Sequence, residues 1–216
     1  YCGSYLQEEI QAEGLVRNIG TFSSFLQVAA LNESNLVVFE SVANDAGVPV
    51  RTVREYFTIL EDTLVGSLLK PYKKATHRKA VSKAKFYLFD AGVSNTLAGR
   101  VGIREKTDHF GRMFEHFIFC ELCRYLEYTR DRRPLTFWRD RRGNEVDFII
   151  GDDVAVEVKG SGAVSDRDTK GLSLLSEGIP LTHKLIVSTD TAPRQLGDIL
   201  VLPWHEFLTR LWDGTF

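Results

Sequence analysis

The stretch "GNEVDFIIGDDVAVEVKG", residues 143–160, carries charged side chains on two apolar strands that are joined by a short acidic turn. Side chains alternate along a strand, so pairing outward from the turn places Asp147 opposite Glu157 and Glu145 opposite Lys159. Two carboxylates that face each other across a hairpin lie about 5 Å apart and repel each other. The sequence therefore predicts a compensating cation beside Asp147 and Glu157.

Either a lysine or a hard divalent metal ion could be that cation. Magnesium binds through one or two carboxylates and keeps waters and substrate phosphates as its other ligands. Lys159 lies two residues after Glu157, so it points the same way and could stabilise charge that develops on phosphorus. Asp147, Glu157 and Lys159 are therefore predicted catalytic residues of phosphodiester hydrolysis, with Mg²⁺ or Mn²⁺ as the cofactor. The alternative is structural: Lys159 pairs with Glu145 across the hairpin, and the acids are solvated.

A further acid lies on the helical pattern "GRMFEHFIFCELCRYLEY" that precedes the hairpin. Glu115 shares an apolar stripe with Phe119 and Leu122. Burying a carboxylate on such a stripe is unfavourable without a partner, which a metal ion, an arginine or a backbone cap would supply. We expect Glu115 to join Asp147 and Glu157 as a metal ligand.

The elements that position these residues alternate between helical and strand patterns, which predicts a mixed α/β fold. A helix over residues 111–128 is followed by a strand over 135–139 and by the two hairpin strands. A helix over 166–177 and strands over 184–188 and 199–202 come next, and Pro203 begins a closing helix. The predicted core face of the hairpin consists of Val146, Phe148, Ile150, Val154, Val156 and Val158.

The N-terminal half has the pattern of a winged helix-turn-helix. Residues 1–31 are helical in pattern, and helices over 38–45 and 50–60 flank Gly47, where a tight turn requires a left-handed backbone. Strands over 64–69 and 86–89 follow, and the run between them is expected to form the wing. The predicted domains are a helical linker region (1–35), the winged helix (36–92) and the hairpin domain (93–216).

The basic run "KPYKKATHRKAVSKAK" contrasts with the net charge of −2 of the whole chain. A block of one sign within a slightly acidic protein indicates an anionic partner, for which DNA is our prediction. An acidic protein surface is the alternative partner. The predicted nucleic-acid contacts come from the second helix and from this run: Arg51, Arg54, Lys73, Lys74, Arg78 and Lys79.

The composition is typical of a globular protein, with 216 residues of which 44% are hydrophobic and 26% charged. Its apolar runs are too short to cross a bilayer and no leader pattern begins the chain, so we predict a cytoplasmic protein without a membrane partner. The cysteine count of three argues against a disulfide framework. Cys120 and Cys123 form a CxxC within a helix, where a second ligand pair is missing, and we interpret them as structural thiols.

The hairpin and its preceding helix resemble the PD-(D/E)XK restriction-endonuclease-like superfamily, through "EVD", a short turn and "EVK". The resemblance implies an α-β-β-β-α-β core with Glu115, Asp147, Glu157 and Lys159 at the motif positions. Val146 stands where the superfamily usually has proline. Over nearly the whole chain, "LEDTLVGSLLKPY", "KAKFYLFDAGVSNTLAG", "GRMFEHFIFCEL" and "WRDRRGNEVDFII" are similar to the C-terminal region of predicted AAA+-type ATPases of bacteria and archaea.

In that family a P-loop ATPase module precedes the winged helix and the nuclease-like domain. No GxxxxGK[ST] occurs in this chain, so the resemblance implies that the module lies upstream of Tyr1 and that the chain has no ATP site. The filled motif favours a Mg- or Mn-dependent deoxyribonuclease. The alternatives are an inactive nuclease-like fold that binds DNA or protein for the ATPase, and a structural role in which the basic run docks on an acidic surface.

Overall fold

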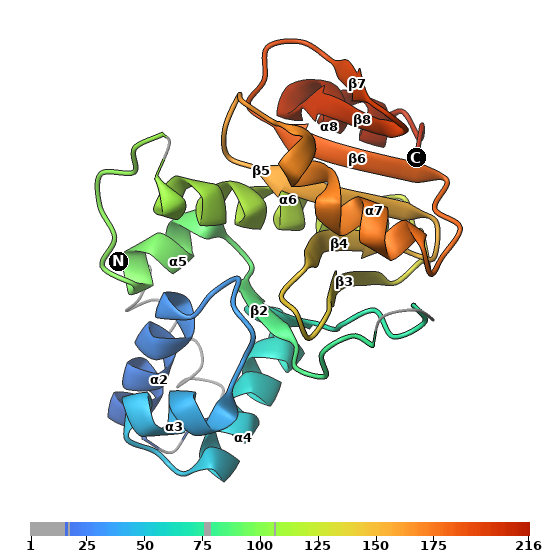
Figure 1. The fold of residues 1–216 in the computed structure, drawn as a ribbon. Helices are drawn as coiled ribbons and strands as arrows, with labels where there is room; N and C mark the ends of the chain where they lie inside the picture. The colour runs from blue at the N-terminus through green and yellow to red at the C-terminus, as the bar shows by residue number, and fades with distance from the viewer. Residues whose placement is uncertain (1–15, 17, 76–78, 106) are drawn as a thin grey trace. The chain divides into compact units, whose positions relative to one another are not determined.

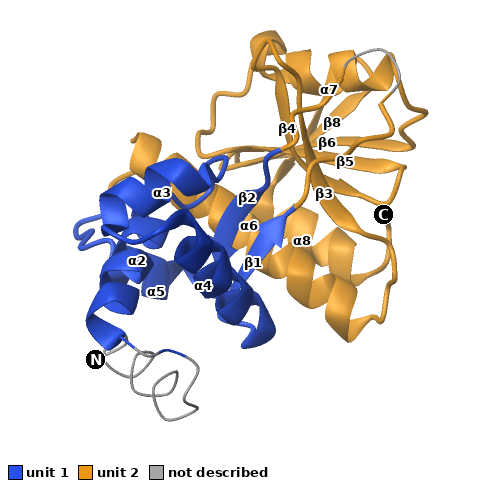
Figure 2. Cartoon of the chain, turned by 90° about the horizontal axis from the view of Figure 1, so that it is seen from below, with its two compact units in different colours: residues 1–69, 83–103 blue, residues 70–82, 104–216 orange. Residues whose placement is uncertain are grey.

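The computed structural model describes residues 16, 18–75, 79–105 and 107–216, and it divides into two compact units (Figures 1 and 2). Unit 1 comprises residues 1–69 and 83–103, and unit 2 comprises residues 70–82 and 104–216. The fold is mixed α/β, as the sequence predicts. Most of the basic run lies in unit 2, whereas the sequence-based domain boundary after residue 92 placed all of it in the N-terminal domain.

Unit 1 contains helices packed beside a two-stranded antiparallel sheet. The predicted helices and strands agree with the structure to within a few residues, and the structure adds a helix after β2 that the sequence analysis does not include. Asp90 starts that helix by accepting hydrogen bonds from the amides of Gly92 and Val93. The predicted helical residues 1–15 lie outside the described part. The elements are α2 (Ile19–Leu31), α3 (Phe39–Ala46), α4 (Val50–Asp62), β1 (Gly66–Leu69), β2 (Lys85–Leu88) and α5 (Ala91–Leu97).

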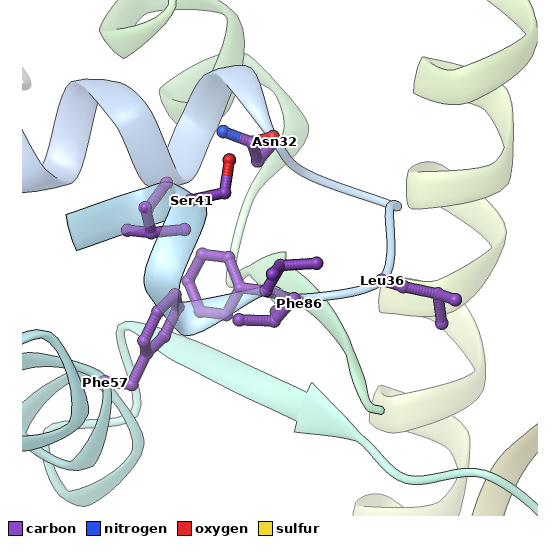
Figure 3. A pocket seen from close by; sticks show the side chains of 9 residues that line it. Asn32, Leu36, Ser41, Phe57 and Phe86 are labelled. Carbon is purple, nitrogen blue, oxygen red and sulfur yellow. The ribbon is translucent and has the colours of Figure 1, made fainter. Parts of the chain in front are cut away.

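The core of unit 1 is aromatic. The Phe57 ring of α4 makes edge contacts with Phe25 of α2 and Phe86 of β2, each at a centroid distance of 5.0 Å. Gly47 ends α3 with φ 66°, the left-handed turn that the sequence predicts between α3 and α4. A pocket of about 50 Å³ opens over the Phe57 and Phe86 rings (Figure 3). This volume is well below the roughly 300–1,000 Å³ of ligand sites, so we do not take this pocket as the functional site.

Unit 2 is built on a six-stranded mixed sheet in the order β3-β4-β5-β6-β8-β7. The first three strands form an antiparallel meander, whereas β6 runs parallel to both β5 and β8. The sequence predicted the order helix, three strands, helix, strand, and it missed the short strand β7. The elements are α6 (Asp108–Tyr128), β3 (Leu135–Arg139), β4 (Glu145–Ile150), β5 (Val154–Lys159), the 3₁₀ helix η1 (Asp166–Thr169), α7 (Lys170–Ser176), β6 (His183–Ser188), β7 (Arg194–Leu196), β8 (Ile199–Pro203) and α8 (Trp204–Trp212).

Helices cover both faces of this sheet. Figure 2 shows α7 on one face and α6 and α8 on the other; α7 contacts β4 and β5, and α6 contacts β5. The prediction of a single core face is therefore wrong, because both faces of the hairpin are buried. The β3–β4 register shifts between Thr136 and Trp138, and Val146 joins the apolar cluster of Ile149 and Ala155 rather than lying apart from them.

The basic run continues the sheet beside β3. Tyr72 donates its amide to the Phe137 carbonyl at 2.6 Å, and the Phe137 amide donates to the Lys70 carbonyl at 3.2 Å. Farther along, Val81 donates to the Arg139 carbonyl at 2.9 Å. Both ends of the segment 70–82 are thus tied to β3 by backbone hydrogen bonds.

Candidate functional site

Where β4 and β5 form hydrogen-bonded pairs, their register is the one that counting outward from the turn predicts. Phe148 pairs with Val156, and the pairs nearer the turn follow the same count. The ladder ends there, and Asp147 Oδ2 accepts the Val158 amide at 2.8 Å. A carboxylate that accepts a backbone N–H is fixed in orientation, so the Asp147 side chain is held against β5.

Asp147 and Glu157 are both 8% exposed. The positive charge that offsets their repulsion comes from a lysine. Lys159 Nζ lies 2.7 Å from Glu157 Oε1 and 3.9 Å from Asp168 Oδ1. The alternative of a Lys159–Glu145 pair is not formed, because Glu145 pairs with Arg139 at 3.2 Å. Of the predicted trio, Glu157 and Lys159 are therefore in direct contact, and Asp147 acts on the lysine through its charge.

The protonation of Lys159 follows from these neighbours. Burial is the largest single influence and disfavours the charged form, but the carboxylates of Glu157, Asp147 and Asp168 together outweigh it. The pKa of Lys159 is therefore raised above its ordinary value. At neutral pH the side chain is a cation among carboxylates.

Asp168 is a member of this cluster that sequence reasoning missed. It lies on η1, and its Oδ2 accepts hydrogen bonds from the Ser165 amide at 2.8 Å and the Ser165 hydroxyl at 2.9 Å. The Ser165 side chain in turn accepts the Asp168 amide, which completes a capping box. The spacing Ser-x-x-Asp before an apolar run signals such a helix start. It carries no signal that the same carboxylate lies near Lys159.

Two glycines let helices approach the strand ends that carry the cluster. A methyl group at Gly160, which directly follows β5, would lie 2.9 Å from the Gly111 Cα in the first turn of α6. A methyl group at Gly171 in α7 would overlap the carbonyl oxygen of Glu145 at the start of β4. Close packing from both faces therefore fixes the ends of β4 and β5.

The three predicted metal ligands are not gathered into one set. Glu115 is half-buried on α6. Over the ranges that the structure describes, no group of three or more His, Cys, Asp or Glu side chains could hold a metal ion. Asp147 and Glu157 remain as a pair of buried carboxylates with Lys159 between them and Asp168.

The CxxC of α6 has the environment of structural thiols. Cys120 is buried, and burial, followed by the neighbouring Cys120, raises the pKa of the Cys123 thiol to about 12. A thiol in that state is protonated at neutral pH, which makes it a poor nucleophile.

The predicted nucleic-acid residues of unit 1 lie on the outer face of α4. Arg51 is exposed and pairs with Glu55 at 3.0 Å one turn later. Arg54 is exposed and its guanidinium lies 4.2 Å from the centre of the Phe39 ring. Both side chains reach solvent, and both already have an intramolecular partner.

The predicted residues of the basic run have different environments. Lys73 and Lys79 are exposed, and Arg78 lies outside the described residues. Lys74 pairs with Asp152 at 2.7 Å and thereby holds the pKa of that carboxyl below its usual value. Asp152 lies in the turn between β4 and β5, at the end of the hairpin remote from Glu157. Lys74 therefore acts at the opposite end of the hairpin from the carboxylate cluster.

Asp152 also affects Tyr72, beside β3. Burial, followed by the charge and the hydrogen bond of Asp152, raises the pKa of Tyr72 to about 12. Tyr72 and Lys74 thus tie the basic run to the turn between β4 and β5.

Residues 1–104 match a family model described as Domain of unknown function (DUF8612), and residues 110–207 match Domain of unknown function (DUF4143). DUF4143 is typically found in the C-terminal region of AAA-type ATPase proteins, which is consistent with the AAA+ context that the sequence resemblance implies. No curated protein and no solved structure matches this chain. Within the described residues, no helix has the length and apolar character that a membrane span requires.

Proposed function

We propose that this chain is the C-terminal part of an AAA-type ATPase and that unit 2 is a restriction-endonuclease-like core that hydrolyses phosphodiester bonds of DNA with a divalent metal ion. The observation that carries the proposal is the arrangement of Asp147, Glu157 and Lys159 where the β4–β5 ladder ends. The proposal also assigns unit 1 the role of a winged helix that contacts DNA through the exposed face of α4.

The donor set fits a hard cation. Asp147 and Glu157 supply two buried carboxylates, and magnesium needs one or two from the protein. In the proposed site these two residues hold the metal, without Glu115. The metal would supply positive charge beside the phosphate and a more acidic water.

The residues of the chain have distinct roles in the proposed reaction. Asp147 is oriented by the Val158 amide, so it keeps its position without a metal. Lys159 neutralises Glu157 in the free protein and can contact a phosphate oxygen, where its charge would stabilise the transition state. Asp168 lies 3.9 Å from the Lys159 ammonium and adds a second negative charge beside it.

A thermal titration tests the metal site. Millimolar Mg²⁺ or Mn²⁺ should raise the melting temperature of the wild type, since a ligand at a hundredfold excess over its dissociation constant stabilises the folded state by about 2.7 kcal/mol. Asp147→Asn removes one ligand charge and keeps the size of the side chain, so this variant should fold without metal and respond much less. An equal metal response in both proteins would contradict the site.

A second candidate function is a nuclease-like fold that binds DNA or protein without cutting. It is favoured by the close Lys159–Glu157 pair and by the failure of Glu115 to join a ligand group among the residues that the structure places. Cleavage of plasmid and branched DNA in Mn²⁺ separates the two functions. A wild type that binds DNA and metal but leaves both substrates intact would establish the second function in place of the first.

A further inference from the structure

Cationic side chains gather at the turn between β3 and β4. Arg141 and Arg142 lie within this turn, and an antiparallel bridge pairs Asp140 with Ala80 of the basic run. The next residues outward from that bridge are Arg141 and Lys79. All of these cationic side chains are exposed. We call Lys79, Arg141 and Arg142 the cationic turn.

Asp140 fixes the backbone that carries the two arginines. Its Oδ1 accepts the amides of Arg142 at 2.8 Å and Asn144 at 3.0 Å, and its Oδ2 accepts the Asn144 side-chain amide at 2.7 Å. Gly143 supplies the left-handed residue of the turn, with φ 84°. Asp140 is 4% exposed, so these hydrogen bonds are shielded from water. The turn is preorganised by its own side chains.

The charges of the cationic turn are not neutralised within the described part of the chain, where Lys79, Arg141 and Arg142 make no ion pair. Neighbouring cations differ, because Arg139 pairs with Glu145 and Lys74 with Asp152. A guanidinium on a fixed backbone can bind a phosphate through two parallel hydrogen bonds and loses little freedom in doing so.

The cationic turn lies close in the chain to the carboxylates of Asp147 and Glu157. Asp147 follows Arg142 by five residues along β4, which at about 3.3 Å per residue separates their backbones by at most about 17 Å. That distance corresponds to about five nucleotides of one strand at roughly 3.4 Å each. A nucleic-acid strand of about five nucleotides would therefore be long enough to reach from the turn to the Asp147–Glu157 pair.

We propose that the cationic turn binds the phosphate backbone of duplex DNA beside the carboxylate cluster. Duplex DNA carries one charge per about 1.7 Å of axis, so cations from two neighbouring segments can meet phosphates of both strands. This inference rests on the proposed function for the identity of the polymer. It assigns the DNA contact to residues of unit 2 that lie outside the PD-(D/E)XK motif.

Fluorescence anisotropy of a short labelled duplex, in EDTA and at several salt concentrations, tests the proposal apart from any cleavage. The double variant Arg141→Gln/Arg142→Gln should reduce the slope of log affinity against log salt by about 1.8, at roughly 0.9 per lost phosphate contact. Lys79→Gln should reduce it by about 0.9.

The matched control is Arg130→Gln/Arg132→Gln, which removes the same charge from exposed arginines between α6 and β3, at the other end of β3. The control should keep the wild-type slope. An unchanged slope in the Arg141/Arg142 variant, an equal loss in the control, or a wild type that does not bind the duplex would each overturn the proposal. A wild type that shows the expected slopes but never cuts in Mn²⁺ would support this inference and contradict the nuclease function.

Discussion

At the scale of single residues, Lys159 distinguishes a catalytic cluster from a structural one. Its ammonium contacts Glu157 and faces Asp147 and Asp168. Lys159→Met keeps the apolar stem and removes the charge. If the charge stabilises the transition state, cleavage should fall about 10²–10³-fold while the metal-induced rise in melting temperature remains. An unchanged cleavage rate would make the lysine purely structural.

The same variant tests the electrostatics through pH. The pKa of Lys159 is raised in the folded protein, so its stabilising contribution is fully present below the unfolded value of about 10.4 and is lost as pH rises through the folded value. We expect Lys159→Met to lower the free energy of unfolding by about 1–3 kcal/mol, below the roughly 3–5 of a fully buried pair, because the side chain is 31% exposed. Urea unfolding should show a constant difference from pH 7 to 10 that shrinks above this range.

Sequence reasoning placed the charged residues of the hairpin strands but not their contacts with other elements. Alternation and the count from the turn place Asp147 and Glu157, because these features depend on neighbours in the chain. The Lys159–Asp168 contact depends on where η1 packs, and the position of Glu115 relative to the pair depends on how α6 lies on the sheet. The spacing of residues along the chain does not indicate either packing arrangement.

At the scale of elements, the approach of α7 to β4 depends on one missing side chain. A methyl group at Gly171 would overlap the Glu145 carbonyl, so Gly171→Ala should destabilise the protein by about 1–3 kcal/mol despite the better helix propensity of alanine. A methyl group at Gly111 in α6 would meet no atom within 4 Å beyond the backbone of its own helix. Gly111→Ala should instead stabilise by about 0.5–1 kcal/mol. Chemical denaturation measures both, and changes of the same sign would contradict this explanation.

Element prediction succeeded where a pattern was long. The 3.6-residue period found α4 and α6, and apolar runs found β3 to β6, whereas α5 and β7 are too short for a period to emerge. The single-face prediction failed for a different reason. The face with Ile149 and Ala155 also carries the charged residues of the hairpin and was therefore interpreted as a site and not as core, but α6 and α7 cover both sides of the sheet.

At the scale of the whole molecule, the two family matches meet near residue 104, where the long stretch of unit 2 begins. The boundary predicted from the sequence, after residue 92, lies before this position. The sequence does not indicate that residues 70–82 belong to unit 2 while the residues on both sides belong to unit 1, because the composition of this segment is that of a charged loop. Backbone hydrogen bonds and isolated bridges at both ends of the segment tie it to the β3 edge of the sheet.

The pairing of residues 70–82 with β3 also determines which fragments can remain monomeric. Without that segment, β3 would be an open sheet edge with unpaired amides and carbonyls, which is a template for strand addition from another molecule. A fragment of residues 104–216 should therefore self-associate, whereas the same fragment with residues 70–82 joined to its N-terminus by a flexible linker should stay monomeric. Size-exclusion chromatography with light scattering measures the oligomeric state of both proteins. A monomeric 104–216 fragment would show that the exposed β3 edge does not cause association. The segment with the most conspicuous positive charge would then also protect the sheet from aggregation.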